Sequence, residues 1–186
     1  MTRALRVCLI GATGRMGMLI AREAPRERFE ITGAVAAPDD PGVGKRLRDL
    51  GAGASDAVVS PPTALGSLLP KSDVCISFVS AQAEMSNLTT VAKARVPFVS
   101  GTTGLTPQQR KEQAAAFEGR VPAVITSNFS VGANLLIAMS AALKALPHGF
   151  DVSIVESHHS GKADSPSGTA LSIAQEVSKA RGYTKT

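Results

Sequence analysis

The stretch Leu5-Arg-Val-Cys-Leu-Ile10 runs directly into Gly11-Ala-Thr-Gly14-Arg-Met-Gly17, and this junction is the strongest indication of the fold class. The first six residues predict a buried strand, and residues 15–23 predict a helix. A glycine-rich turn between the two lets a backbone approach a pyrophosphate, whose charge the free N–H groups at the helix start can hold. The spacing predicts a dinucleotide site formed by Gly11, Ala12, Thr13, Gly14, Arg15, Met16 and Gly17. The alternative is a tight strand-to-helix turn that binds nothing.

The following hundred residues repeat this alternation of short strands and longer helices. Strands are predicted at 29–36, 74–79, 97–100 and 121–126, and helices at 82–95 and 107–117. Thr106 is expected to cap the last of these helices, with Pro107 in its first turn. Such a rhythm predicts an α/β fold, a Rossmann-like doubly wound parallel sheet with helices on both faces. The Pro- and Gly-rich stretch 37–62 is expected to be a surface excursion.

The character of the sequence changes after Asn128. A helix is expected at 134–146, a strand at 150–155 and a helix at 166–180 that stops near Gly182. One strand does not make a sheet, so this region reads as an incomplete α+β substrate domain. The predicted organisation is a dinucleotide-binding domain over 1–127 and a substrate-binding and catalytic domain over 128–186.

Composition limits the class of function. The 186 residues are 44% hydrophobic and 19% charged, which is ordinary for a globular protein. The net charge of +5 comes from scattered basic residues, and aromatic residues are only 4%, so a nucleic-acid partner is not expected. No apolar run approaches the roughly 20 residues of a membrane helix. Cys8 and Cys75 lie in strand-like runs without a metal-binding spacing, which indicates buried, reduced thiols and a cytoplasmic protein.

A second group of chemistry-bearing residues follows the late strand, in the stretch E-S-H-H-S-G-K-A-D-S-P-S-G-T-A at 156–170. A histidine can exchange a proton near neutral pH, and Lys162 beside it can anchor a carboxylate or donate a proton. Ser165 suits an N-cap and Pro166 a first helical position. The N–H groups of Ser167, Gly168 and Thr169 would then be free to bind an anion, so the stretch predicts a carboxylate socket beside a proton donor.

Two other interpretations of this stretch stay open. It could be a polar loop followed by a well-capped helix. It could also hold a metal through His158, His159 and Asp164, although the neighbouring Lys162 argues against a bound cation. We therefore expect no metal.

Two shorter signals support a site at one edge of the sheet. Gly101-Thr102-Thr103-Gly104 ends the strand at 97–100, and Ser127-Asn128-Phe129-Ser130 ends the strand at 121–126. In open α/β sheets, ligands bind at the carboxyl ends of the strands. An ordinary turn is the alternative for each.

Together these motifs resemble the dihydrodipicolinate reductase family of lysine and diaminopimelate biosynthesis. The resemblance spans the whole chain and rests on G-A-T-G-R-M-G at 11–17, G-T-T-G at 101–104, S-N-F-S-V-G at 127–132 and the long stretch at 156–170. It implies the reduction of 4-hydroxy-tetrahydrodipicolinate, a small cyclic dicarboxylate, to tetrahydrodipicolinate with a hydride from NADH or NADPH.

The resemblance also implies roles at the matching positions. His158 would be the proton donor or acceptor, and Lys162 a second proton donor. His159, Gly168 and Thr169 would bind the substrate carboxylates, beside the N–H group of Ser167. The residues that would line the nicotinamide side are Gly101, Thr102, Thr103, Ser127, Asn128, Phe129 and Ser130.

The sequence departs from the family pattern in three places. Ala37, followed by Pro38, takes the place of the acidic residue that commonly binds the ribose, while Asp39 and Asp40 come slightly late. Lys45 and Arg46 lie further on and could meet a 2′-phosphate, so NADH and NADPH both stay open. Ser77 takes the acidic place of the usual Asp-Phe-Thr run.

Third, family members run on well past the position of Thr186 and are typically homotetramers. The chain therefore looks like a member that lacks its C-terminal part. This leaves two alternatives to the reductase: a non-catalytic dinucleotide-binding fragment or sensor, and a reductase of a related small cyclic imine or dicarboxylate.

Overall fold

The computed structural model describes residues 3–158 and 166–183. The chain divides into two compact units, Met1–Thr126 and Ser127–Thr186, which are described separately below. No helix among the described residues is both long and apolar enough to cross a membrane.

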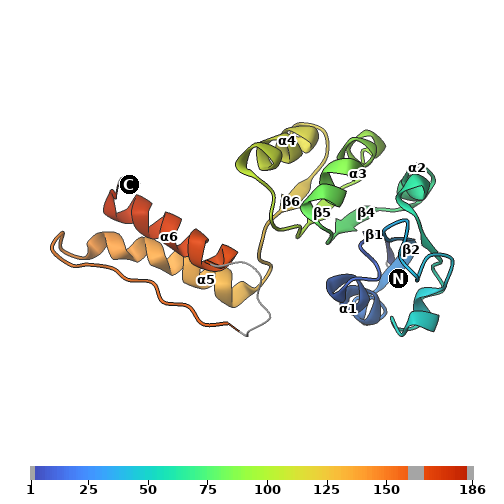
Figure 1. The fold of residues 1–186 in the computed structure, drawn as a ribbon, viewed down its shortest axis with the longest axis horizontal. Helices are drawn as coiled ribbons and strands as arrows, with labels where there is room; N and C mark the ends of the chain where they lie inside the picture. The colour runs from blue at the N-terminus through green and yellow to red at the C-terminus, as the bar shows by residue number, and fades with distance from the viewer. Residues whose placement is uncertain (1–2, 159–165, 184–186) are drawn as a thin grey trace. The chain divides into compact units, whose positions relative to one another are not determined.

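The first unit is built on a parallel sheet of six strands within the described residues (Figure 1). The strands are β1 (Leu5–Ile10), β2 (Phe29–Val35), β3 (Val59–Ser60), β4 (Val74–Ser77), β5 (Phe98–Ser100) and β6 (Ala123–Ile125). Their order in the sheet is β3-β2-β1-β4-β5-β6, so the chain reverses its direction of winding between β1 and β4. This confirms the predicted Rossmann-like fold, and ligands of such sheets bind at the point of reversal.

Side chains alternate along β1 and supply two cores, one on each face of the sheet. Cys8 and Ile10 point into the core covered by α2 (Leu65–Leu68), α3 (Ala81–Ala94) and α4 (Pro107–Phe117), which closes with a Phe98–Phe117 ring stack at 4.5 Å. Val7 and Leu9 point to the opposite core, beneath α1 (Arg15–Glu23). Every side chain from Val7 to Ile10 is buried, which explains the unbroken apolar run in the sequence.

The two cysteines lie side by side in the sheet. Cys8 on β1 and Cys75 on β4 are register partners, and both are buried and free of a disulfide, as predicted. A hydrogen bond with Cys8, together with burial, raises the pKa of the Cys75 thiol well above its usual range. Both side chains therefore serve as small neutral core residues.

Helix caps follow the sequence closely in this unit. The Thr106 hydroxyl accepts from the N–H of Gln109, and the Gln109 side chain accepts from the N–H of Thr106, which completes a capping box ahead of Pro107. Ser80 caps α3 with its hydroxyl alone, which accepts from the N–H of Ala83. These caps fix where α3 and α4 begin relative to the strand ends that precede them.

The stretch 37–62 is more than the surface excursion that its composition suggested. It contains a 3-10 helix at Leu47–Leu50, and Leu47 and Ala52 are fully buried in the core beneath α1. Val59 belongs to β3 and pairs with Ala34. Prolines and glycines shape its turns, but its few apolar side chains complete one face of the sheet.

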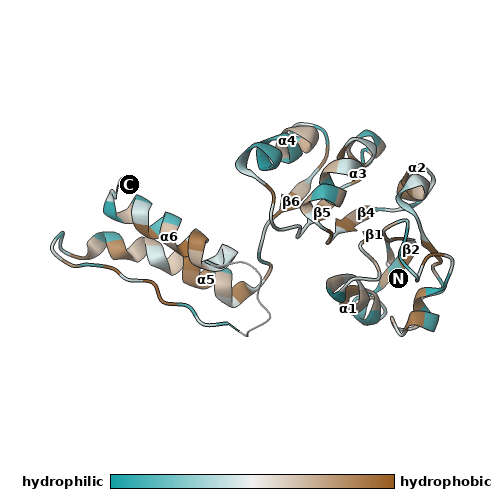
Figure 2. Cartoon of the chain, viewed as in Figure 1, coloured by the Kyte–Doolittle hydropathy of each residue, from teal (hydrophilic) through white to brown (hydrophobic). Residues whose placement is uncertain are grey.

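The second unit is helical in its described part. It contains α5 (Val131–Ser140), a 3-10 helix at Ala141–Ala145 and α6 (Gly168–Arg181). Helix α5 begins three residues before the predicted position because the Ser130 hydroxyl accepts from the N–H of Ala133. Figure 2 colours part of α5 brown, the colour of hydrophobic residues. Four of its large apolar side chains are exposed: Val131, Leu135, Leu136 and Met139.

The predicted strand at 150–155 is wrong for this structure. The segment is not helical, yet no described strand pairs with it, so no sheet forms. An apolar, β-favouring sequence becomes a strand only when a second backbone accepts its hydrogen bonds. The expected α+β character of this unit is therefore absent from the residues that the structure describes.

Candidate functional site

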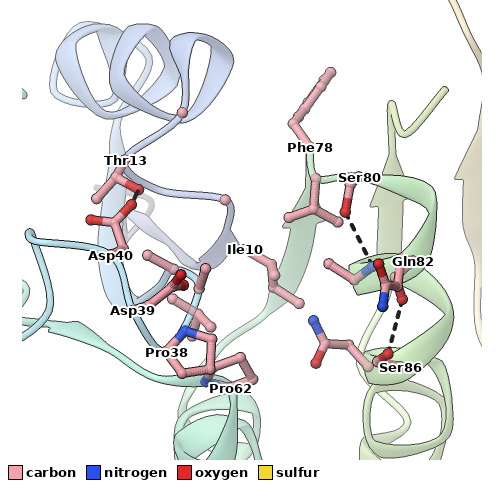
Figure 3. A pocket seen from close by; sticks show the side chains of 18 residues that line it. Ile10, Thr13, Pro38, Asp39, Asp40, Pro62, Phe78, Ser80, Gln82 and Ser86 are labelled. Atoms are coloured by element: carbon pink, nitrogen blue, oxygen red, sulfur yellow. Dashed lines mark hydrogen bonds between the residues drawn. The ribbon is translucent and has the colours of Figure 1, made fainter.

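A cavity of about 760 Å³ opens at the point where the sheet reverses its winding (Figure 3). One wall is formed by the glycine-rich loop and by the residues that follow β2. The opposite wall is formed by Phe78 and by the first turns of α3, including Ser80, Gln82 and Ser86. The volume falls in the range of small-molecule sites, and the location is the one that general fold rules favour.

Glycine is required at two positions of the loop between β1 and α1. Gly11 has a φ of +83°, and a Cβ there would lie 2.2 Å from the carbonyl oxygen of Phe78. A Cβ on Gly17 would lie 2.1 Å from the carbonyl oxygen of Gly11. The loop therefore packs backbone against backbone on both sides, which brings the start of α1 to the edge of the cavity.

The N–H groups of the loop divide into two sets. Those of Gly11 and Ala12 donate to the carbonyl oxygen of Val35, at 2.8 and 3.0 Å, and Ala12 is fully buried. Those of Arg15, Met16 and Gly17 make no hydrogen bond to any described residue, and Gly14 caps α1 without a side chain. The second set is available to an anion, and it coincides with the positive end of the helix dipole. The loop thus fits the pyrophosphate of a dinucleotide.

A hydrogen bond ties this loop to the segment after β2. The Thr13 hydroxyl donates to Oδ2 of Asp40 at 2.7 Å (Figure 3). Oδ1 of Asp40 accepts from the N–H of Gly42, also at 2.7 Å. Both oxygens of Asp40 are therefore engaged in holding the wall of the cavity. Arg15 and Met16 are exposed and do not line the cavity.

A buried carboxylate joins the strand ends behind the opposite wall. Glu84, 3% exposed in the first turn of α3, accepts from the hydroxyls of Ser77 and Ser100 at 2.5 Å each. It also accepts from the Gln113 amide at 2.6 Å. Because a carboxylate only accepts, both serines must donate. The Ser100 oxygen in turn accepts from the N–H of Thr102 at 3.3 Å, which connects the carboxylate to the loop after β5.

The predicted residues after β5 lie against Phe78. A Cβ on Gly101 would lie 2.0 Å from Cε1 of the Phe78 ring, so this ring occupies the space that glycine leaves. Thr102 is buried and accepts from the N–H of Val79 at 3.3 Å, whereas Thr103 is exposed. Gly101 and Thr102 thus set the position of Phe78, which lines the cavity.

In the second unit, two of the predicted stretches come together. The Asn128 amide donates to the Thr169 hydroxyl at 2.9 Å, and a Cβ on Gly168 would lie 3.8 Å from the Ser127 hydroxyl. The Asn128 side chain also accepts from the N–H of Ser130 at 2.8 Å. The stretch 127–130 is therefore placed at the N-terminus of α6, the element predicted to bind an anion. Phe129 is exposed there.

The start of α6 differs from the prediction. Ser167, not Ser165, is the N-cap, and its hydroxyl accepts from the N–H of Ala170 at 3.1 Å. Glu156 accepts from the N–H of Ser167 at 2.8 Å and from its hydroxyl. The N–H of Ser167 is therefore occupied rather than free for a ligand. The N–H groups of Gly168 and Thr169 make no hydrogen bond to a described residue.

His158 lies next to the same glutamate. Its Nδ1 is 3.6 Å from Oε2 of Glu156, and its side chain is 39% exposed. His159 and Lys162 lie outside the described residues, as do Asp164 and Ser165. The described residues contain no group of three side chains able to hold a metal ion.

Comparison with known proteins identifies families and relatives that this chain matches. A family model described as the N-terminus of dihydrodipicolinate reductase matches residues 5–129, and one described as its C-terminus matches residues 132–186. The chain belongs to the dihydrodipicolinate reductase family. It is 38% identical over 181 residues to a 4-hydroxy-tetrahydrodipicolinate reductase of Methanopyrus kandleri and 39% identical over 183 residues to that of Rubrobacter xylanophilus. These matches cover 95% and 96% of the chain but 66% of each relative, so the chain spans about two thirds of their length.

Solved structures agree with this placement. A dipicolinate-bound dihydrodipicolinate reductase from Paenisporosarcina sp. TG-14 superimposes with a TM-score of 0.70 at 25% identity, over 98% of this chain and 69% of that one. An amine dehydrogenase from Mycobacterium smegmatis gives 0.55 at 19% identity, over 75% of this chain and 43% of that one, and shares the fold alone.

Two glutamates of this family member were assigned no role from the sequence. Glu84 reads as an ordinary acidic residue in a first helical turn, and only the tertiary structure shows that it receives three hydrogen bonds. Glu156 belongs to the quoted 156–170 stretch, but nothing in the sequence pairs it with Ser167. The signal that could have pointed to Glu84 is Ser77. This serine stands where the family pattern has an acidic residue, so a carboxylate from another element could have been sought beside it.

Proposed function

We propose that the chain carries the nucleotide site and a large part of the substrate site of a 4-hydroxy-tetrahydrodipicolinate reductase. The reaction would reduce 4-hydroxy-tetrahydrodipicolinate to tetrahydrodipicolinate in lysine and diaminopimelate biosynthesis. The observation that carries the proposal is the cavity at the sheet reversal, walled by a loop in which Gly11 and Gly17 admit no side chain. Membership of the family supports the choice of substrate.

The first unit would bind the nicotinamide dinucleotide, NADH or NADPH, which supplies a hydride when bound. The unpaired N–H groups of Arg15, Met16 and Gly17 would donate to the pyrophosphate, reinforced by the dipole of α1. Gly101 and Thr102 would act on the nicotinamide side by fixing the ring of Phe78. Thr103, Ser127, Asn128, Phe129 and Ser130 keep the nicotinamide-side role that the resemblance implies.

The second unit would bind the dicarboxylate substrate. The N–H groups of Gly168 and Thr169 would receive one carboxylate at the start of α6, where Ser167 holds the helix end through Glu156. Replacing the C4 hydroxyl by hydrogen consumes a hydride and a proton and releases water, so an acid is required. His158, whose Nδ1 is 3.6 Å from Oε2 of Glu156, would supply that proton. His159 would bind a carboxylate and Lys162 would be a second proton donor, as the resemblance implies.

The test is the near-ultraviolet absorbance of NADH and NADPH, followed with the purified chain and freshly generated 4-hydroxy-tetrahydrodipicolinate. The expected result is decay that falls by about 100-fold or more in His158→Gln and in Lys162→Ala. His148→Gln is the matched control, because His148 is an exposed histidine outside the proposed site. Unchanged turnover in both variants would overturn the proposed chemistry.

The alternatives are separated by two further measurements. A fragment or sensor would bind nucleotide calorimetrically without turnover. A reductase of a related cyclic imine or dicarboxylate would prefer another member of a substrate panel. A homotetramer and a cytoplasmic location stay predictions, to be checked by light scattering and by cell fractionation.

A further inference from the structure

We infer that Ser100, held by the buried carboxylate of Glu84, positions the end of the cavity at which the nicotinamide would bind, an inference that rests on the nucleotide site proposed above. Ser100 is the last residue of β5 and is 1% exposed, and Glu84 lies in the first turn of α3. Neither of these two described residues lines the cavity. They can act on a bound ligand only through the groups that do line it, so both are positioning residues and not catalytic ones.

The Glu84 carboxylate bridges the ends of two neighbouring strands. Ser77 and Ser100 are register partners at the ends of β4 and β5, and each donates to the carboxylate at 2.5 Å. Ser77 binds Oε2 and Ser100 binds Oε1. Gln113 on α4 donates to Oε1 at 2.6 Å and to the Ser100 hydroxyl oxygen at 3.2 Å. The carboxylate therefore connects β4, β5, α3 and α4 at the point where the loops after the two strands begin.

Of the two serines, Ser100 alone connects the carboxylate to the loop after β5. Because Glu84 only accepts, the Ser100 hydroxyl donates to it, and the Ser100 oxygen can accept from the N–H of Thr102 at 3.3 Å. The Thr102 hydroxyl accepts from the N–H of Val79, also at 3.3 Å, and Val79 lines the cavity. Within the described residues, the Ser77 side chain bonds to Glu84 alone. Ser100 is thus the link between the buried carboxylate and the cavity wall.

The loop that Ser100 holds also sets the position of the Phe78 ring. The N–H of Gly101 donates to the carbonyl oxygen of Ser77 at 3.0 Å, and a Cβ on Gly101 would lie 2.0 Å from Cε1 of Phe78. The ring therefore packs against the backbone of Gly101, and Phe78 lines the cavity (Figure 3). A shift of this backbone would move the ring or leave a gap beside it. Misplacement of a bound group by about 1 Å can cost a reaction about 100-fold, so a fixed loop matters to a nicotinamide bound here.

The experiment is isothermal calorimetry on the full chain with NADH and with ADP-ribose, and then with NADPH and 2′-phospho-ADP-ribose. Each fragment lacks the nicotinamide, so the ratio of the two affinities in a pair measures the contribution of the nicotinamide end without any turnover. The wild-type chain should bind at least one dinucleotide about tenfold or more tightly than its fragment. Ser100→Ala should leave the fragment affinity within about threefold and bring that ratio to within about threefold of one. It should also reduce the change in dihydronicotinamide fluorescence on binding.

Ser77→Ala is the matched control. It removes a hydrogen bond of the same length from the same carboxylate at an equally buried strand end, but it breaks no side-chain bond to the loop after β5. It should keep the affinity ratio within about threefold of the wild type. Glu84→Gln retains an accepting oxygen for Ser100 and should also keep the ratio. Thr102→Val breaks the next bond of the chain with a side chain of similar shape and should lower the ratio, which preserves the test if Ser100→Ala does not fold.

The outcomes separate a positioning role from a purely structural one. An equal fall of the ratio in Ser77→Ala and Ser100→Ala would overturn the inference, because any loosening of the buried network would then have the same effect. A ratio that Ser100→Ala does not change, or a ratio near one in the wild type for both pairs, would overturn it while leaving the nucleotide site intact. If no dinucleotide or fragment binds to the wild-type chain, the proposed function and the inference both fail.

Discussion

Replacing Glu84 by leucine removes the acceptor that three buried donors share. Ser77, Ser100 and Gln113 each donate to this carboxylate at 2.5 to 2.6 Å. Hydrogen bonds to a charged group contribute about 1.5–3 kcal/mol each, so the three together are worth roughly 4.5–9 kcal/mol. Removal of the charge also relieves its desolvation cost, which is several kcal/mol. The net loss should be about 3–5 kcal/mol, a large fraction of the 5–15 kcal/mol that stabilises a typical domain.

Glu84→Gln separates the effect of charge from that of shape. The amide keeps one accepting oxygen, so only one of the three donors has to reverse its role, and a loss of about 1–2 kcal/mol is expected. Glu112→Leu is the control for the leucine variant, since Glu112 is exposed on α4 next to Gln113. Its stability should stay within about 0.5 kcal/mol of the wild type.

The assay is urea unfolding followed by far-ultraviolet circular dichroism, because the chain has no tryptophan. The free energies of the variants are compared at a common slope. A loss below about 1 kcal/mol in Glu84→Leu would refute the reasoning, since it would mean that the three donors find other partners at little cost.

Two further predictions concern the nucleotide loop and the ion pairs at the start of the central strands β1 and β4. Gly11→Ala should abolish nucleotide binding in calorimetry, because φ is +83° at this position and the added methyl would lie 2.2 Å from a carbonyl oxygen. Gly66→Ala is the control and should bind nucleotide normally, because a Cβ there meets nothing within 4 Å. Nucleotide binding by the Gly11 variant would contradict the argument. Asp73 accepts from Arg3 and Arg6, which hold the pKa of its carboxyl far below the ordinary value, so its stabilisation is present above about pH 4 and lost as the pH falls below that. The urea midpoint should therefore fall more steeply with acidification in the wild type than in Asp73→Asn. If the two proteins lost stability in parallel, the ion pairs of Asp73 with Arg3 and Arg6 would be excluded as a cause of the acid sensitivity.

The first unit is largely readable from its sequence because local signals agree there with tertiary ones. The apolar run 7–10 is buried on both faces of the sheet, and Thr106 caps the helix that begins at Pro107. The Glu84 network could not be predicted, because it joins residues up to 29 positions apart that share no local pattern. Its members are two serines at strand ends, a glutamate in a first helical turn and a glutamine in the middle of α4, which only the folded sheet brings together.

The second unit shows where local reasoning fails. The segment 150–155 has a strand-like composition, but a partner backbone is a property of the rest of the structure. At the start of α6, Ser165 and Ser167 are both good capping residues. The residue that caps the helix, Ser167, also hydrogen-bonds to Glu156, eleven positions away. Helix propensities are local and cannot predict such a contact.

Helix α6 has a mechanical consequence for the chain that precedes it. Arg181 at its end donates to the carbonyl oxygens of Leu146, Pro147, His148 and Phe150, and Ser167 at its start binds Glu156. The 14 residues of α6 rise about 21 Å, while the six peptide units from Phe150 to Glu156 reach at most about 20–22 Å. The contacts at the two ends of α6 therefore keep residues 150–156 extended, although no described strand pairs with them. The free-energy cost of ordering their backbone, roughly 1–2 kcal/mol per residue, is therefore already met without strand pairing.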